Sequence, residues 1–410
     1  MNAGKTAFRT VVGVAVAALA MSGCSSSPST GSSGPGGGTF KFGLVTSSVG
    51  PFAPNYKSMV DGAQYATKVI NDGGGVNGAK IDLVTVDTQN NPSNGVTMLP
   101  KLATSDQVFA IVGPVDSAGC DIACTAANKL KVPLISPGAG RPGVLANARP
   151  YAFTLVQPDA ANSTPVLEQI VKKNNVRTAA IISDDATAVT KAQRDLFDNV
   201  FAQTNVQVAK HVTFSSGDAS FASQVTSIAQ SKPDVLALAA GPADAGRIAR
   251  EVHSQGLSTT LLGTGSLQSG GAAYYAAGGP ATEGTLSAAQ YDPTNPTQPA
   301  KDLLAKAQTA TGQAEIPLNF AYAYDAVNML VQIINSKGVK PGDSPDKART
   351  QIKDGLNALK DYDGMAGKTT FTDDGTAIRP QLLAVLKNGV FVIDHIQLTG
   401  RTVRRVTTRC

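Results

Sequence analysis

From residue 39 onward, short apolar runs alternate with segments in which apolar residues recur every three to four positions. The runs are typical of buried strands, and the segments between them are typical of helices with one buried face. In the first part of the chain the expected strands are 40–45, 81–86, 108–112 and 132–135, and the expected helices are 56–71, 94–105 and 121–130. Because helices separate consecutive strands, we expect a parallel sheet with helices on both faces.

The same alternation resumes after Pro158. Strands are expected at 178–182, 207–214, 235–239 and 260–262, helices at 187–203, 221–230, 244–255, 319–335 and 346–359, and further strands at 368–371, 382–387 and 390–396. A length of 410 residues also exceeds what one ordinary core accommodates. We therefore predict an α/β protein with two domains of similar layout.

The N-terminus has the layout of a secretory signal. Lys5 and Arg9 precede an apolar run at 11–20, and small residues follow. The run is about half the ~20 residues needed to cross a membrane. We expect a signal peptide at 1–23.

The segment 19–24 (LAMSGC) resembles the bacterial lipobox, in which the cysteine becomes the lipidated first residue, although Met21 stands where that pattern prefers Leu. The Ser-, Gly- and Pro-rich stretch behind it cannot bury a core and is typical of a flexible tether. We expect a lipid on Cys24 and a tether through residue 38. An ordinary signal peptide with a chance cysteine is the alternative.

Charge argues against a nucleic-acid partner. The chain has 35 basic and 30 acidic residues, but two basic residues lie in the leader and four in the last ten residues, so the body has a net charge near −1. A nucleic-acid binder needs a basic stripe along its body. We expect no nucleic-acid partner.

The remaining cysteines leave two readings open. Cys120 and Cys124 are four residues apart in an exported chain, which permits a disulfide, but two small buried thiols fit equally well. Cys410 is unpaired in either case. The three histidines are scattered, so we expect no metal site.

Catalytic motifs are scarce. The chain lacks G-x-S-x-G, H-E-x-x-H and a P-loop, and its one G-x-G-x-x-G match at 138–143 is bracketed by prolines and followed by a non-helical pattern. The adjacent carboxylates at 184–185 and 373–374 are typical of helix caps and turns. We expect neither an enzyme nor a cofactor.

Small and polar residues instead gather where expected strands end. In open α/β sheets, ligands bind outside the carboxyl ends of the strands, and four such loops are distinctive here: 46–52, 113–119, 136–140 and 241–246. Ser117 stands directly before an expected helix. Its hydroxyl could hold an anion such as a carboxylate beside free helical N–H groups, or it could cap the helix.

Several motifs, in order along residues 40–400, match one known family. The motifs are Gly50-Pro51-Phe52, Asp61-Gly62-Ala63, 70–74 (INDGG), 110–114 (AIVGP), 132–137 (VPLISP), 150–153 (PYAF), 232–234 (KPD), 283–284 (EG), 323–326 (AYDA) and 367–371 (GKTTF). Together they resemble the branched-chain amino-acid-type solute-binding proteins of ABC transporters, which have the class I periplasmic binding-protein fold.

The resemblance implies two Rossmann-like lobes, each a parallel sheet flanked by helices. Three hinge crossovers would join the lobes near 153–158, 287–293 and 366–371. Lobe 1 would then comprise 39–156 and 293–366, and lobe 2 would comprise 157–292 and 367–410. A ligand would bind between the lobes, which close over it by a hinge motion.

The resemblance also places contact residues. Ser117 falls on the hydroxyl that binds the ligand's α-carboxylate, and Gly138 falls on a neighbouring backbone contact. Asp244 falls where the family has a Glu that pairs with the α-ammonium. Phe221 and Tyr291 fall on aromatic walls. These positions imply a ligand with both charges.

Other positions depart from the family pattern. Gly140 replaces a Thr that contacts the ligand, Ala188 replaces a Tyr that covers it, and Asn55 replaces an aromatic residue of the first lobe. Asn90 and Asp116 occupy the positions of a disulfide found in some relatives. The pocket should therefore be larger and wetter than one for a branched-chain amino acid.

The resulting hypothesis is a monomeric binding protein, exported and lipid-anchored to the outer face of the cell membrane. It would capture a small amino-acid-like solute and deliver it to ABC permease subunits. A ligand-sensing co-receptor of the same fold is the alternative. A nicotinamide-dependent enzyme built on 138–143 is a third and less favoured possibility.

Overall fold

The computed structural model describes residues 37–50, 52–91, 93–295 and 297–394. The predicted signal peptide, Cys24, most of the predicted tether and Cys410 lie outside these residues. Among the helices that the structure describes, none combines the length and the apolar character needed to cross a membrane.

The first sheet has five parallel strands in the order β2-β1-β3-β4-β5. Its strands are β1 (Thr39–Thr46), β2 (Lys80–Asp87), β3 (Ala110–Val112), β4 (Leu134–Ser136) and β5 (Ala152–Thr154). The helices between them are α1 (Ala53–Asp72), α2 (Asn94–Pro100) with a π-helical continuation (Lys101–Ser105), and α3 (Ser117–Lys129). The alternation predicted from the sequence is confirmed.

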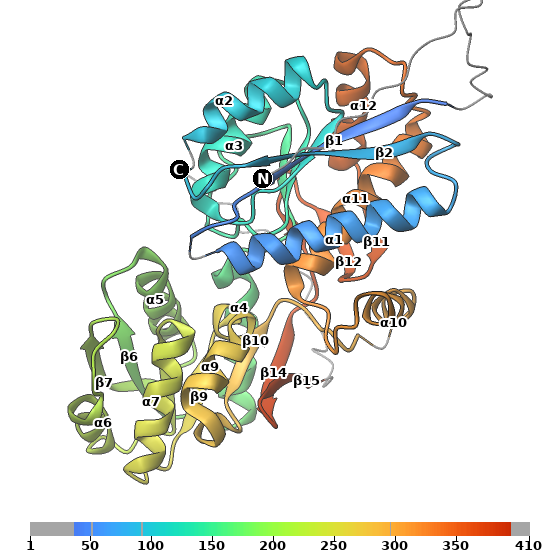
Figure 1. Cartoon of the computed structure of the whole chain (residues 1–410). Helices are drawn as coiled ribbons and strands as arrows, with labels where there is room; N and C mark the ends of the chain where they lie inside the picture. The colour runs from blue at the N-terminus through green and yellow to red at the C-terminus, as the bar shows by residue number, and fades with distance from the viewer. Residues whose placement is uncertain (1–36, 51, 92, 296, 395–410) are drawn as a thin grey trace, which may run out of the picture. The chain divides into compact units, whose positions relative to one another are not determined.

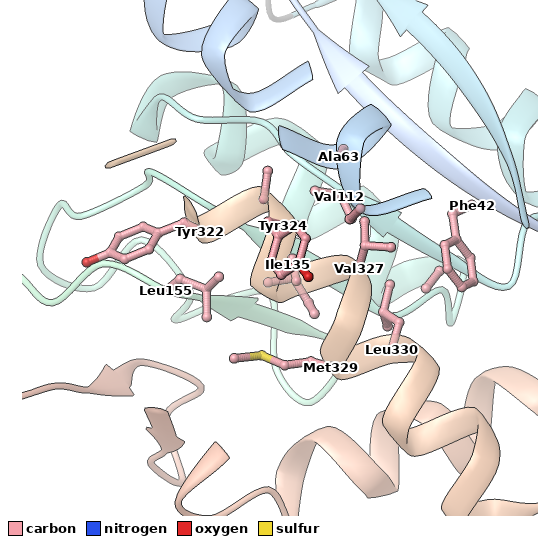
Figure 2. Packing of buried hydrophobic residues seen from close by; sticks show 14 of the residues in the cluster. Phe42, Ala63, Val112, Ile135, Leu155, Tyr322, Tyr324, Val327, Met329 and Leu330 are labelled. Atoms are coloured by element: carbon pink, nitrogen blue, oxygen red, sulfur yellow. The ribbon is translucent and has the colours of Figure 1, made fainter. Parts of the chain in front are cut away.

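Helices from distant parts of the chain cover one face of this sheet. Helix α1 packs beside α11 (Leu318–Lys337), with α12 (Pro345–Asn357) next to it, whereas α2 and α3 cover the other face (Figure 1). Val327 and Leu330 of α11 share a buried cluster with Phe42 of β1 (Figure 2). The first sheet therefore has a complete core only when residues beyond 318 are in place.

A glycine sets how closely α1 and α11 approach. A Cβ atom at Gly62 would lie 2.2 Å from the carbonyl oxygen of Phe320, which is shorter than any van der Waals contact. Only glycine lets the two helix backbones meet at this point. This packing explains the glycine of the Asp-Gly-Ala motif noted in the sequence.

The second sheet has seven strands in the order β15-β14-β10-β9-β8-β6-β7, in which β14 alone runs antiparallel to its neighbours and the other strands run in one direction. Its strands are β6 (Thr178–Asp184), β7 (Gln207–Phe214), β8 (Val235–Ala239), β9 (Thr260–Gly263), β10 (Leu286–Ala289), β14 (Leu382–Lys387) and β15 (Val390–Asp394). Its helices are α4 (Asp159–Lys173) and α5 (Ala188–Gln203) on one face, and α6 (Ala222–Ala229), α7 (Pro242–Ser254), α8 (Gly265–Ser269) and α9 (Gly271–Gly278) on the other. The predicted mixed α/β class with two helix-flanked, largely parallel sheets is confirmed.

Helix α10 (Ala300–Thr311) precedes α11. A small antiparallel sheet contains β11 (Tyr362–Gly364), β12 (Gly367–Phe371) and β13 (Ala377–Ile378). It packs with the first sheet, since the rings of Phe371 and Phe153 lie 5.0 Å apart. In addition, the Thr154 amide donates to the Gly375 carbonyl at 3.0 Å.

The sequence analysis assigned these residues differently. It began the last part of lobe 2 at residue 367, whereas 367–378 share the core of the first sheet. The strand pattern identifies β12 but carries no information about which core it joins. We therefore propose that the third boundary between the lobes falls at 379–381, directly before β14.

Candidate functional site

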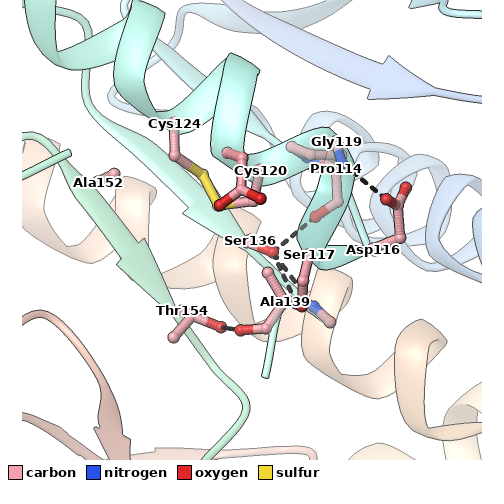
Figure 3. Close-up of a disulfide and its surroundings, with 12 residues drawn as sticks. Pro114, Asp116, Ser117, Gly119, Cys120, Cys124, Ser136, Ala139, Ala152 and Thr154 are labelled. Atoms are coloured by element: carbon pink, nitrogen blue, oxygen red, sulfur yellow. Dashed lines mark hydrogen bonds between the residues drawn. A yellow bond between two sulfur atoms is a disulfide. The ribbon is translucent and has the colours of Figure 1, made fainter. Parts of the chain in front are cut away.

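Helix α3 begins earlier than its apolar pattern predicts, at Ser117. The residue before it, Asp116, caps the helix by accepting a hydrogen bond from the Gly119 amide at 2.7 Å (Figure 3). Ser117 is therefore not the cap, so the simpler of its two interpretations is wrong. Its Oγ instead accepts a hydrogen bond from the Arg141 amide at 3.1 Å. This bond leaves the hydroxyl proton available to a ligand.

The loop after β4 packs against the start of α3. Ser136 Oγ donates to the Pro114 carbonyl at 2.6 Å and accepts from the Ala139 amide at 3.0 Å, which joins the two loops (Figure 3). A Cβ atom at Gly138 would lie 2.4 Å from the Val115 carbonyl oxygen. The structure thus brings Ser117, Gly138 and Gly140 to one edge of the sheet. We call residues 114–119 and 136–140 the first edge.

A disulfide joins Cys120 and Cys124 within α3, with their Cα atoms 4.8 Å apart (Figure 3). Both cysteines are fully buried against the sheet. Of the two possibilities that the sequence left open, the structure has the disulfide. It links two successive turns of the helix that begins at Ser117.

A cavity of about 140 Å³ lies beside the first turn of α3, at the carboxyl ends of β1, β2 and β3. Tyr56, Asn90 and Asp116 line it, and the Tyr56 hydroxyl donates a hydrogen bond to Asp116. Burial, reinforced by this bond, raises the pKa of Tyr56 well above its usual range. Asn55 is exposed on α1, next to Tyr56. The sequence analysis identified the substitutions at Asn90 and Asp116 but missed Tyr56.

A second cavity of about 190 Å³ lies beside the segment that follows β4, and residues between 139 and 146 line it. Gly140, Val156 and Arg149 line it together with Asp374 and Thr376 from the turn before β13. A Cβ atom at Gly140 would lie 2.7 Å from Val156, so a larger residue would enter this wall. Since the turn was assigned to the other lobe, its contribution here could not be predicted.

On the second sheet, Asp244 lies in the first turn of α7, which follows β8. It is 7% exposed and forms an ion pair with Arg247, one turn further along the helix. The Ser216 hydroxyl donates to its other oxygen at 2.9 Å. Gly241 is the N-cap residue of α7, so Asp244 does not cap this helix.

Phe221 lies beside this pair. It is 3% exposed, and its ring meets Phe214 edge to face at 5.2 Å. The Arg247 guanidinium covers the ring at 5.0 Å from its centroid. The side chain is therefore a core residue beneath Arg247, although it was expected as an open wall. We call Ser216, Asp218, Phe221, Asp244 and Arg247 the second edge.

Tyr291, the other expected aromatic wall, follows β10 and is 3% exposed in the core of the first sheet. Its ring meets that of Tyr322 edge to face at 6.4 Å. Burial raises the pKa of Tyr291 well above its usual range, and nearby acids, Asp325 first among them, add to this shift.

Arg379 links segments near all three expected crossovers, and the sequence analysis did not single it out. Its Nε donates to the Leu155 carbonyl at 2.9 Å, and its guanidinium lies 4.1 Å from the ring centroid of Tyr322. Tyr322 in turn donates to the Gln290 carbonyl at 3.0 Å. In the sequence, the only signal for Arg379 is its position between a short strand and a proline.

The G-x-G-x-x-G match at 138–143 lacks the structural context of a dinucleotide site. The segment after 138–143 forms turns up to β5, whereas a dinucleotide fingerprint must open a helix. Among the described residues, no group of three or more His, Cys, Asp or Glu side chains is placed to hold a metal ion.

The comparisons with known proteins match nearly the whole described chain. A family model described as "Periplasmic binding protein" matches residues 39–390. The Leu/Ile/Val-binding protein homolog 3 of Brucella melitensis is 24% identical over 82% of this chain and 88% of that protein. The Leu/Ile/Val-binding protein BraC3 of Rhizobium johnstonii is 26% identical over 81% and 87%. These matches confirm the resemblance that the sequence motifs indicated.

Solved structures agree on the fold. The branched-chain amino acid transporter substrate-binding protein LivJ of Streptococcus pneumoniae, in complex with isoleucine, has a TM-score of 0.71 at 23% identity and covers 87% of this chain and 99% of its own. A solute-binding protein of an ABC transporter from R. palustris, in complex with benzoate, has a TM-score of 0.70 at 21% identity over 87% and 95%. At these identities the likeness establishes the two-lobed α/β architecture.

Proposed function

This chain belongs to the periplasmic binding-protein family, and on that premise we propose that it captures a small amino-acid-related carboxylate outside the cytoplasm for an ABC importer. Relatives of this chain are named as Leu/Ile/Val-binding proteins, and structural neighbours hold isoleucine or benzoate. A carboxylate is the chemical group that these two ligands share.

The observation that carries the proposal is the geometry of the first edge. Ser117 stands in the first turn of α3 with its hydroxyl proton free to donate, while the Arg141 amide occupies an acceptor position on the oxygen. Other N–H groups of a helical first turn lack partners within the helix, and the helix dipole favours an anion there. A carboxylate at this place would meet the Ser117 hydroxyl and the helix N-terminus, while the two acids nearby already have partners: Asp116 accepts from the Gly119 amide, and Asp121 pairs with Arg141.

Delivery requires the ligand to be held between two lobes that open and close. We propose lobe 1 as 39–156 and 293–378, and lobe 2 as 157–292 and 382–394. Arg379 and Tyr322 would then lie at the hinge, where hinge motions concentrate changes in a few backbone positions. Under this proposal the protein binds as a monomer and returns its ligand chemically unchanged.

Export and anchoring complete the proposal. The charged and apolar leader supports export, and the lipobox-like segment ending at Cys24 supports a lipid anchor on the outer face of the cell membrane. Cys24→Ala should release the protein from the membrane fraction or leave it unprocessed. A wild-type protein that already extracts into buffer without detergent would contradict the anchor.

A ligand-sensing co-receptor remains the second candidate, because the same fold and the same anchor would serve it. The two differ in whether ligand crosses the membrane. Uptake of a radiolabelled ligand should be lost when the gene is deleted, if the protein serves an importer. Unchanged uptake with a lost transcriptional response would favour the co-receptor.

Binding itself is tested by thermal unfolding of the full-length protein against amino acids, amides, hydroxy acids and aromatic acids. A ligand at 100 times its dissociation constant adds about 2.7 kcal/mol to the free energy of unfolding. A single chemical class should raise the melting temperature, and Ser117→Ala should reduce that shift. No shift with any carboxylate would contradict the proposed ligand class.

A further inference from the structure

The acid expected to hold a ligand ammonium already has a cation. Asp244 is paired with Arg247, which lies three residues later on α7. The Ser216 hydroxyl donates to the second carboxylate oxygen at 2.9 Å. Both oxygens of Asp244 therefore have partners, and only 10% of its side chain is exposed. An ammonium ion would have to displace one of these partners to reach it.

Arg247 is held in place by more than Asp244. Its Nη1 donates to the Asp218 carbonyl in the loop after β7, and its guanidinium covers the ring of Phe221 at 5.0 Å from the centroid. These contacts come from two segments, the loop between β7 and α6 and helix α7 itself, so the guanidinium has a fixed position. A planar guanidinium loses little entropy on binding when it is fixed in this way.

The guanidinium also keeps donors for a ligand. It has five N–H groups, and Asp244 and Asp218 use two of them. The side chain is 32% exposed, three times the exposure of its partner Asp244. A molecule that approaches the second edge can thus reach the more exposed guanidinium and its remaining N–H donors more readily than the Asp244 carboxylate.

We propose that Arg247 sets the ligand class by making the second edge select against an α-ammonium group and for a neutral or anionic acceptor. The protein would then prefer carboxylic acids that carry a hydroxyl, a carbonyl or a second carboxylate in place of the ammonium. This inference rests on the proposed function, because it assumes that the second edge faces the captured ligand.

The physical basis is repulsion combined with a costly displacement. An ammonium at this position is repelled by Arg247, and any pairing with Asp244 leaves the guanidinium without its carboxylate in a partly dry site. An acceptor oxygen meets no such penalty and gains a charge-assisted hydrogen bond. Discrimination of this kind uses an element that repels the wrong ligand as well as one that attracts the right one.

The test measures dissociation constants by calorimetry for matched pairs on the full-length protein. The pairs are L-leucine with 2-hydroxy-4-methylpentanoate, and L-phenylalanine with 3-phenyllactate, which differ in ammonium against hydroxyl. The variants are Arg247→Gln, which frees Asp244, and Arg247→Lys, which keeps the charge. Arg250→Gln is the matched control, since it removes one positive charge from an exposed position of the same helix.

The wild type should bind the hydroxy acid of a pair at least about tenfold more tightly, and Arg247→Gln should shift this ratio about tenfold or more toward the amino acid. Arg247→Lys and Arg250→Gln should keep the wild-type preference. If the wild type prefers amino acids and Arg247→Gln leaves the ratio unchanged, the inference is overturned while ligand capture stands. If no member of either pair binds wild type or variants, the proposed ligand class itself fails, and the inference with it.

Discussion

The two edges that we assign to ligand binding are built in different ways. The first edge is made of backbone and small residues, with two loops joined through Ser136 and held close by Gly138. The second edge is made of long side chains, with an acid and an arginine already paired over a phenylalanine ring. We therefore expect family positions to transfer to the first edge, whereas at the second edge the family's acidic position, Asp244, already has a cationic partner in Arg247.

Exposure sharpens the contrast. An acid–arginine pair, Asp121 with Arg141, also lies next to the first edge, but both side chains are about half exposed. Such pairs contribute little to stability or selectivity because solvent screens them. The pair of Asp244 and Arg247 is more buried, at 10% and 32%. We therefore expect the Asp–Arg pair of the second edge to contribute more to stability and selectivity than the exposed pair of Asp121 and Arg141.

The largest expected effect concerns a third acid, Asp325 of α11, which is more deeply buried than Asp244. Its two oxygens accept hydrogen bonds from the Met365 and Ala366 amides at 2.7 and 2.9 Å. Burial raises the pKa of Asp325 to about 7, although Arg379 and these amides counteract the rise. Asp325 thus shows how burial raises the pKa of a carboxyl group whose hydrogen-bond partners are backbone amides, whereas Asp244 is paired with an adjacent arginine.

The sign follows from proton binding. Between pH ~4 and ~7 the folded protein holds a proton on Asp325 that the unfolded chain has lost, so stability falls as pH rises, by on the order of 4 kcal/mol. Above pH ~7 this contribution is constant. Urea unfolding at several pH values should show the slope in wild type and a flatter profile in Asp325→Asn. An unchanged slope in the variant would show that another titratable group causes the pH dependence of stability.

The next effect compares one substitution at both edges. Gly138→Ala places a Cβ atom 2.4 Å from the Val115 carbonyl oxygen, whereas Gly241→Ala meets nothing within 4 Å. The first should destabilise the fold by about 1–3 kcal/mol, and the second by less than about 1 kcal/mol, as for a weaker helix cap. Chemical denaturation measures both. An equal loss of unfolding free energy in the two variants would show that the two loops of the first edge can move apart without destabilising the fold.

A third test removes the covalent support of the first edge. The Cys120→Ala, Cys124→Ala double variant opens a five-residue loop, for which the chain-entropy model gives a loss of about 2 kcal/mol. We expect a lower melting temperature than in wild type. Reduced wild-type protein serves as the control, because it keeps the side chains and loses only the bond. A melting temperature equal to that of oxidised wild type would show that packing alone holds α3.

The smallest effect concerns Ser117. Ser117→Ala removes the hydroxyl that accepts from the Arg141 amide, and the exposed site limits the cost to stability to within about 0.5 kcal/mol. Ligand affinity should fall by about 1–2 kcal/mol when the bound carboxylate loses this donor. Ser117→Thr keeps the hydroxyl and should restore most of the affinity. If Ala and Thr bind ligand equally well, Ser117 has no part in recognition.

Much of the fold was predictable because strand and helix periodicity is a local property. Strands β7, β8 and β14 begin and end at the predicted residues. The start of α3 was placed four residues late, since its first turn is set by a capping aspartate and not by an apolar repeat. The assignment of 367–378 depended on tertiary packing, for which the pattern gives no signal.

The site was less predictable for a similar reason. The positions of Ser117, Gly138 and Gly140 follow from strand ends and helix starts, and the structure places them together. The burial of Phe221 and Tyr291 depends on side chains that meet only in three dimensions, whereas the partner of Asp244 lies three residues later on the same helix. An Asp followed three residues later by Arg on an expected helix was the available signal, because such residues face each other.

The contact between Gly62 and Phe320 has a consequence for how this chain acquires its structure. The first sheet is complete in sequence by residue 154, yet the face on which α1 packs is only partly covered until α11, more than 160 residues later, has been made. Nearly all of the second sheet lies between, and its helices come from one continuous stretch. Long-range contacts form slowly, and local ones form first. The part of the described chain that leaves the ribosome first should therefore be the last to reach its native packing.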